Sequence, residues 1–176
     1  MKILLAILTI NLFLIAQEDS SSPMLTYFTI SPDTVDVINE SANATLTLGA
    51  TDDLSGLSSG SIVMRSPSDS YIEVGNINFQ GLLSEALSTE ITIDQYAEPG
   101  SWYVSYISLY DQIGNSVTIQ TSTLDSMGFE TELFVLSNVD DSAPSLTYFS
   151  IFPDTLNVID GPENIILTLG AADNLS

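Results

Sequence analysis

The chain repeats part of its own sequence. Residues 23–34, PMLTYFTISPDT, return at residues 144–155 as PSLTYFSIFPDT. When residues 22–55 are aligned with residues 143–176 at a constant offset of 121, 20 of 34 positions are identical. The offset gives a repeating unit of about 121 residues. A unit of this length has the size of an independent domain, and it is too long for one turn of a solenoid.

The offset divides the chain into parts. We expect a complete repeat over 22–138, a linker over 139–143, and the truncated start of a second repeat over 144–176. A linker of about five residues holds adjacent units close together. Other repeats of the same chain are therefore the first partners that we expect for each unit.

The N-terminus has the pattern of a secretory signal peptide. Lys2 precedes an apolar stretch that ends at Ala16, and the polar residues 17–21 follow as a linker. The stretch is short for a transmembrane span. We expect residues 1–16 to be removed, which predicts a secreted or cell-surface protein that is not inserted in the membrane after cleavage. An uncleaved N-terminal anchor is the alternative.

The composition excludes several classes of function. The chain has no cysteine and no histidine, and its 2 basic residues, Lys2 and Arg65, oppose 23 carboxylates for a formal net charge of −21. Nucleic-acid binding depends on basic residues that neutralise phosphates, so it is excluded, and anionic membranes repel the chain. Zinc lacks its usual ligands in a chain without His or Cys. Hydrophobic residues still make up 44% of the chain, which favours a folded protein over a disordered acidic tail.

Short strand patterns separated by turn residues predict an all-β unit, with the architecture of an immunoglobulin-like β-sandwich. Alternation along one strand places Trp102, Val104 and Tyr106 on one face, and Tyr103, Ile107 and Leu109 on the other. We expect Trp102 in the core; the alternative is a sugar-stacking platform. The predicted strands are Leu25–Ile30, Thr45–Ala50, Ser61–Arg65, Tyr71–Val74, Glu90–Ile93, Trp102–Tyr110, Ser116–Thr123 and Thr131–Ser137.

Three short motifs carry a resemblance to known proteins. They are NVDDSAP over 138–144, DDLSG over 52–56 and DQIGN over 111–115. In this order and spacing they resemble the bacterial Ig-like and cadherin-like repeat modules of large secreted or cell-surface proteins. The resemblance implies an extracellular structural or adhesive role. The linker lacks the full cadherin acidic set, so cadherin calcium geometry is not carried over to this chain.

Acidic residues from three distant segments are predicted to meet at one end of the sandwich, because the loops that carry them share that end. Such a cluster suits Ca²⁺, which takes six to eight oxygen ligands. Capping of turns by Asp and Asn side chains is the alternative, and the sequence leaves both open. The candidate ligands are Asp19, Asp52, Asp53, Asp111 and Asn115, with Asp140, Asp141 and Asp173 in the linker and the second copy.

No enzyme is predicted. Serine nucleophiles lack a neighbouring base, and the carboxylates Glu73, Asp94 and Glu98 show no sign of convergence in the sequence. The sequence therefore favours a non-catalytic extracellular structural or adhesive repeat module, with Ca²⁺ stiffening the junction between repeats and a cell-surface or extracellular ligand as its external partner. Two alternatives stay open, which are an ancillary Ig-like module of a secreted hydrolase and a carbohydrate-binding module.

Overall fold

The computed structural model describes residues 18–138, 140 and 142–174, and these residues are nearly all in β-structure. The leader predicted over 1–16 lies outside the described residues. Each predicted strand overlaps an observed one, but Ser116–Thr123 extends too far, Glu90–Ile93 covers only the end of the strand Ser84–Ile93, and the short strand Thr34–Asp36 was not predicted. The elements are β1 Met24–Ser31, β2 Thr34–Asp36, β3 Ala42–Thr51, β4 Leu57–Arg65, β5 Ile72–Asn78, β6 Ser84–Ile93, β7 Gly100–Asp111, β8 Ser116–Gln120, α1 Thr121–Ser126, β9 Glu132–Leu136, β10 Ser145–Phe152 and β11 Ile166–Ala172.

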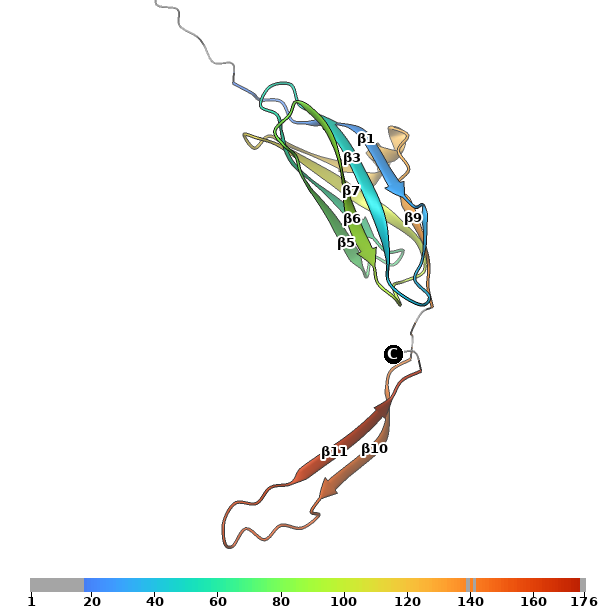
Figure 1. The fold of residues 1–176 in the computed structure, drawn as a ribbon, viewed down its shortest axis with the longest axis vertical. Helices are drawn as coiled ribbons and strands as arrows, with labels where there is room; N and C mark the ends of the chain where they lie inside the picture. The colour runs from blue at the N-terminus through green and yellow to red at the C-terminus, as the bar shows by residue number, and fades with distance from the viewer. Residues whose placement is uncertain (1–17, 139, 141, 175–176) are drawn as a thin grey trace, which may run out of the picture.

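The strands up to β9 form two sheets. One sheet has the order β1-β3-β6, and the other has the order β2-β9-β7-β4-β5, with β8 also paired to β7. The neighbours are antiparallel except for β2 and β9, which run parallel. In Figure 1 the β1-β3-β6 sheet lies over the larger one, and the arrangement is consistent with a β-sandwich.

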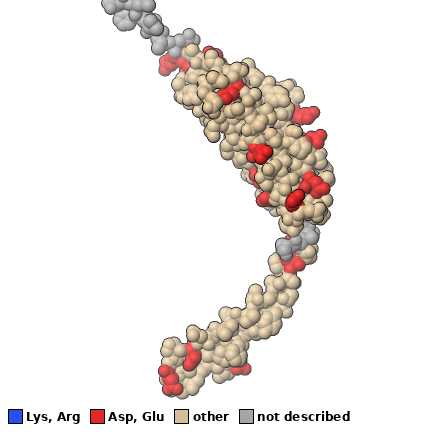
Figure 2. Space-filling model, in the orientation of Figure 1, with Lys and Arg blue, Asp and Glu red and all other residues tan. Residues whose placement is uncertain are grey.

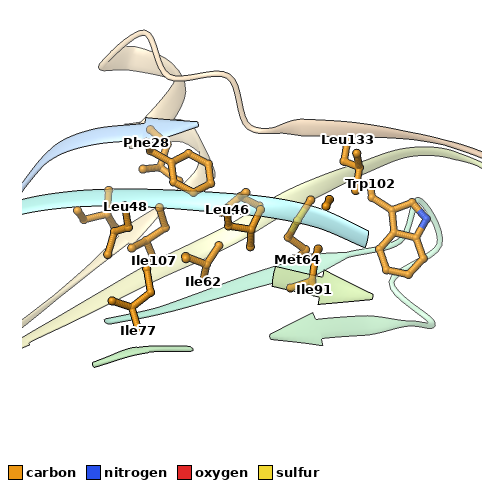
Figure 3. Packing of buried hydrophobic residues seen from close by; sticks show 14 of the residues in the cluster. Phe28, Leu46, Leu48, Ile62, Met64, Ile77, Ile91, Trp102, Ile107 and Leu133 are labelled. Atoms are coloured by element: carbon orange, nitrogen blue, oxygen red, sulfur yellow. The ribbon is translucent and has the colours of Figure 1, made fainter. Parts of the chain in front are cut away.

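The two sheets enclose one hydrophobic core. Leu46 and Leu48 of β3 face Ile62 and Met64 of β4 and Ile107 of β7, and all five side chains are fully buried (Figure 3). Burial of one such side chain contributes about 1.5–3 kcal/mol, so this layer accounts for a large share of the favourable free energy of folding. Trp102 lies at one end of the cluster and is 1% exposed, so the prediction that it belongs to the core is confirmed.

A β-bulge in β7 makes part of the predicted face assignment wrong. Val63 pairs with Tyr106 and Met64 pairs with Val104, so Ser105 has no partner on β4. An extra residue reverses the alternation beyond it. Ile107 and Leu109 consequently join Trp102 and Val104 on the core face, and Tyr106 is only half-buried.

The predicted strand Ser116–Thr123 ends early, because its last residues belong to α1. Strand β8 pairs with β7 at Tyr106–Tyr110, whereas β9 pairs with the same edge at Gly100–Tyr103. Between β8 and β9 the chain passes Val104 and Ser105 of β7. Thr121 is held there, since its Oγ1 donates to the carbonyls of Val104 at 2.7 Å and Ser105 at 3.0 Å. This tertiary contact overrides the strand propensity of a threonine-rich segment.

Strands β10 and β11 form a separate two-stranded antiparallel sheet, which lies apart from the sandwich in Figure 1. Most of its apolar side chains are exposed, including Leu146, Phe149 and Leu169. Within the described residues, no helix is long and apolar enough to cross a membrane.

Candidate functional site

Three segments that are far apart in the sequence meet at one end of the sandwich. Asp19 enters before β1, Asp52 and Asp53 follow β3, and Asp111 ends β7 with Asn115 in the turn after it. One ligand oxygen from each of Asp19, Asp52 and Asp53 lies within 4.8 Å of the others. Elsewhere the acidic side chains are scattered over the face shown in Figure 2, and no lysine or arginine is visible on that face.

Asp19 is bound to the turn after β3. Its Oδ2 accepts a hydrogen bond from the backbone N–H of Ser55 at 2.8 Å, and its Oδ1 accepts one from Ser21 N–H at 3.1 Å. The hydrogen bonds from Ser55 and Ser21 lower the pKa of Asp19, and they outweigh the opposing effect of burial. Asp19 is 8% exposed, so the segment predicted as a linker over 17–21 is docked where it is described.

Asp52 has one oxygen engaged in the turn and one left over. Its Oδ2 accepts hydrogen bonds from the N–H groups of Gly56 at 2.7 Å and Leu54 at 3.2 Å. Its Oδ1 is buried and has no hydrogen-bond partner. A buried carboxylate oxygen without a partner is costly, and a cation held beside it would remove that cost. Asp53 is exposed, and its Oδ2 accepts a hydrogen bond from Ser21 Oγ at 3.0 Å.

Asp111 and Asn115 lie beside this group but serve mainly to hold their own turn. Asp111 Oδ1 accepts from Asn115 N–H at 2.7 Å and Ile113 N–H at 3.0 Å, and its Oδ2 accepts from Asn115 Nδ2 at 2.7 Å. Burial raises the pKa of Asp111, but the hydrogen bonds from Asn115 and the turn backbone outweigh it, so the pKa is lowered. Asn115 Nδ2 also reaches the carbonyl of Asp19 at 3.4 Å, which ties the two segments together.

The described ones among the predicted ligands of the linker and the second copy, Asp140 and Asp173, are not part of this cluster. Asp140 Oδ1 accepts a hydrogen bond from Ser142 N–H at 3.2 Å, which repeats the Asp19–Ser21 contact at the same offset. Asp173 Oδ1 accepts one from Asn174 N–H at 2.6 Å. Asp141 lies outside the described residues. In the part of the chain that is described, the carboxylate group with metal-binding spacing is Asp19, Asp52 and Asp53.

The donor set fits a hard divalent cation. Three carboxylates with a buried spare oxygen offer the ligands that Ca²⁺ prefers, and no nitrogen or sulfur ligand is available for zinc. Turn capping and metal binding are not exclusive here. Asp52 Oδ2 and Asp111 cap turns, while Asp52 Oδ1 remains for a ligand.

The prediction that the three candidate catalytic carboxylates do not converge is wrong for two of them. Glu73 and Asp94 line the same cavity of about 220 Å³, together with Tyr71, Tyr96 and Trp102. Glu98 is separate, since its Oε2 accepts a hydrogen bond from Ser68 Oγ at 2.6 Å. The sequence concealed the pair because Glu73 comes from β5 and Asp94 follows β6, which are edge strands of different sheets.

A larger and more open groove of about 830 Å³ lies beside α1 and β9. Four carboxylates line it, from Asp33, Asp125, Glu130 and Glu132, alongside Tyr103 and Phe134. Asp125 is engaged, because its Oδ1 accepts from Thr131 Oγ1 at 2.9 Å, and Glu132 Oε2 accepts from Ser101 Oγ at 2.9 Å. Two of its four carboxylates are thus used internally, and the groove is a weaker candidate site than the two described above.

Comparison with known proteins yields one family. Residues 18–148 match DUF7035, a domain of unknown function. The match begins before Asp19 and ends inside β10, so it includes the acidic cluster and the whole sandwich. No curated protein matches the chain.

Proposed function

This chain belongs to the DUF7035 family, and we propose that it is a non-catalytic extracellular structural or adhesive protein, built from immunoglobulin-like repeats of which residues 144–176 open the second copy. The observation that carries this proposal is the shared register of β1–β3 and β10–β11. Every residue pair in one sheet has its counterpart in the other at the offset of 121, including Leu25–Ala50 and Leu146–Ala171.

The strand order of residues 22–138 supports the immunoglobulin-like assignment. The three-stranded sheet β1-β3-β6 faces a sheet in which β2 pairs in parallel with β9 and β7 pairs with β4. In immunoglobulin-like sandwiches the first two strands pair in one sheet with the fifth, and the last two strands lie in the second sheet. Here the chain breaks at Pro32, so that β1 pairs in the smaller sheet and β2 in the larger one.

The repeat proposal is tested by completing the second copy. Ser176 aligns with Ser55, so appending residues 56–138 after Ser176 supplies the remaining strands of the unit. We expect this extended protein to contain two folded units, with a larger calorimetric unfolding enthalpy and an elongated shape in small-angle X-ray scattering. A version with the appended residues in scrambled order is the control. If the appended segment stays unfolded, residues 144–176 do not open a second sandwich.

We propose that Asp19, Asp52 and Asp53 bind Ca²⁺ at the end where the chain enters the unit. The buried Oδ1 of Asp52 supports this, because it lacks a partner that a cation would provide. Extracellular sites bind calcium with dissociation constants of about 10⁻⁴–10⁻³ M. When the free calcium concentration is ten to a hundred times the dissociation constant, one site would stabilise the unit by about 1.4–2.7 kcal/mol.

The measurement is thermal unfolding in calcium, in EGTA, and in magnesium at matched ionic strength, since screening of a charge of −21 also stabilises the chain. We expect calcium to raise Tm by several degrees beyond magnesium. Asp53→Asn should remove most of that difference, whereas Asp36→Asn, an exposed aspartate outside the cluster, should keep it. A calcium effect below about 1 °C contradicts the site.

We propose export to the cell exterior on the basis of the sequence at residues 1–16. Cleavage after Ala16 leaves Gln17 as the first residue. Mass spectrometry of protein secreted from an expressing cell tests this, and an intact N-terminus on the exported protein contradicts cleavage.

A further inference from the structure

A small cavity lies at the open edge of the sandwich, away from the acidic cluster. It is formed where β5, the last strand of the larger sheet, approaches the end of β6, the last strand of the smaller one. Its volume is about 220 Å³, and its lining includes Tyr71, Glu73, Asp94, Tyr96 and Trp102.

Two aromatic rings form a rigid part of this cavity. The rings of Tyr71 and Trp102 are stacked, with centroids 6.4 Å apart and an interplanar angle of 29°. Trp102 is held in place, because it is buried and its Nε1–H donates to the carbonyl of Glu98 at 2.8 Å. Tyr71 is 53% exposed, so its ring remains accessible to a ligand.

A third ring is placed there at a conformational cost. Tyr96 has a φ of 69°, in the left-handed region that bulky residues rarely adopt. It is the third residue of a turn closed by the bond from Ala97 N–H to the carbonyl of Asp94 at 3.1 Å. Gly or Asn is usual at a turn position with positive φ, and a strained aromatic residue beside a cavity points to a role in binding.

The cavity also carries two carboxylates without a compensating cation. Burial raises the pKa of Glu73, and the negative charge of Asp94 raises it further. No hydrogen bond opposes these two effects on Glu73 within the described residues. Arg65 is the one basic side chain in the described part of the chain, and it does not line the cavity.

We propose that this cavity binds an alkylammonium group, such as a lysine ammonium or a trimethylammonium headgroup. Cations are attracted to the faces of aromatic rings, and the exposed ring of Tyr71 offers such a face, while the two carboxylates supply the opposite charge. Sites for drug-sized ligands have volumes of about 300–1,000 Å³, so a cavity of about 220 Å³ suits a single small cationic group.

A sugar fits the observations less well than a cation. The ring of Trp102 is 1% exposed and its N–H is already used, so it offers neither a stacking platform nor a free donor. The cation site is also separate from the proposed calcium site, because none of Asp19, Asp52 and Asp53 lines the cavity.

Trp102 is the only tryptophan of the chain, so its fluorescence reports directly on this cavity. The full chain is titrated with tetramethylammonium, choline and Nα-acetyl-lysine methylamide, each against NaCl at matched ionic strength. We expect a saturable fluorescence change with the ammonium compounds and none with NaCl. The neutral isostere of choline, 3,3-dimethylbutanol, should bind far more weakly, because it has the shape of choline without the charge.

Substitutions distinguish the contribution of the aromatic ring to binding from that of the carboxylates. Tyr71→Leu should weaken ammonium binding about two- to thirtyfold, as expected for one cation–π contact. Glu73→Gln and Asp94→Asn should each weaken it as well. The matched controls are Tyr110→Leu and Glu90→Gln, which alter an exposed tyrosine and an exposed glutamate outside the cavity and should leave binding unchanged.

The outcomes decide the proposal in each case. Preference for choline assigns the ligand to a trimethylammonium headgroup, preference for the lysine derivative assigns it to a protein side chain, and equal binding supports the ammonium class. The proposal is overturned if NaCl or dimethylbutanol reproduces the change, if the charge variants bind like the wild type, or if glucose gives the saturable response instead. Should Tyr71→Leu fail to fold by circular dichroism, Glu73→Gln and Asp94→Asn carry the test.

Discussion

The strand pair β1–β3 and the strand pair β10–β11 have the same pairing but opposite burial. Leu25 pairs with Ala50 and Leu146 pairs with Ala171, and the ladder shifts by one residue directly after both leucines. In the sandwich, Leu46 is fully buried, whereas its counterpart Leu167 is 61% exposed. Phe28 and Phe149 differ in the same way.

This contrast separates two contributions to the fold. The register and the bulge recur without the rest of the sandwich, so local sequence is enough to specify how these two strands pair. Burial requires the facing sheet, because Leu46 and Leu48 pack against side chains from β4 and β7. A two-stranded sheet alone is marginally stable in water, so we expect the sandwich to provide nearly all of the stability.

The largest difference between the two strand pairs should come from a leucine truncation. Leu46→Ala removes a fully buried side chain and should lower the free energy of unfolding by about 2–5 kcal/mol. Leu167→Ala alters the equivalent position of β11 and should change it by no more than about 0.5 kcal/mol. Urea unfolding followed by Trp102 fluorescence measures both.

The extended protein that carries residues 56–138 after Ser176 sharpens this test. If β10–β11 opens a second sandwich, Leu167→Ala becomes destabilising there by an amount similar to Leu46→Ala. Equal and small effects of both leucine variants in the original chain would contradict the observed core.

A smaller difference is expected at a pair of equivalent glycines. A Cβ added at Gly49 would lie 2.9 Å from Tyr27 Cβ and 3.5 Å from Ala86 Cβ, which comes from β6. The neighbouring strand restricts relaxation there, so Gly49→Ala should destabilise the sandwich by about 1–3 kcal/mol. At Gly170 the contacts come from Thr147 and Tyr148 of β10 alone, and Gly170→Ala should leave the urea midpoint unchanged. A larger effect at Gly170 than at Gly49 would reverse the comparison.

The sequence predicted those features that depend on local pattern. Alternation and turn residues located most of the strands, although not β2 or the first half of β6, and apolar character placed Trp102 in the core. The internal repeat correctly paired Asp19 with Asp140, since both accept a hydrogen bond from the serine two residues later. The order of the strands brought Asp19, Asp52 and Asp53 to one end, because a sandwich places alternate loops together.

The features that the sequence did not predict depend on contacts between distant strands. The bulge at Ser105 is visible only in the pairing of β7 with β4, and it moved Ile107 and Leu109 to the core face. The helix α1 lies where the chain passes from β8 to β9, which pair with different parts of the same edge of β7. Predicting the cavity with Glu73 and Asp94 would have required the knowledge that β5 and β6 are neighbouring edge strands of different sheets.

The smallest difference in stability is expected between substitutions of the equivalent aspartates Asp19 and Asp140. It is measured best as the pH dependence of the urea midpoint in EGTA. The pKa of Asp19 is lowered in the folded chain, so its carboxylate stabilises the fold above the unfolded pKa of about 3.9. That contribution is lost as the pH falls through the folded pKa. Asp19→Asn should therefore lower the urea midpoint at pH 6, and the gap to the wild type should close below about pH 4. Asp140→Asn should match the wild type throughout, since Asp140 accepts its hydrogen bond from Ser142, outside the sandwich. A gap that persists at low pH would mean that Asp19 acts through its packing and not through its charge.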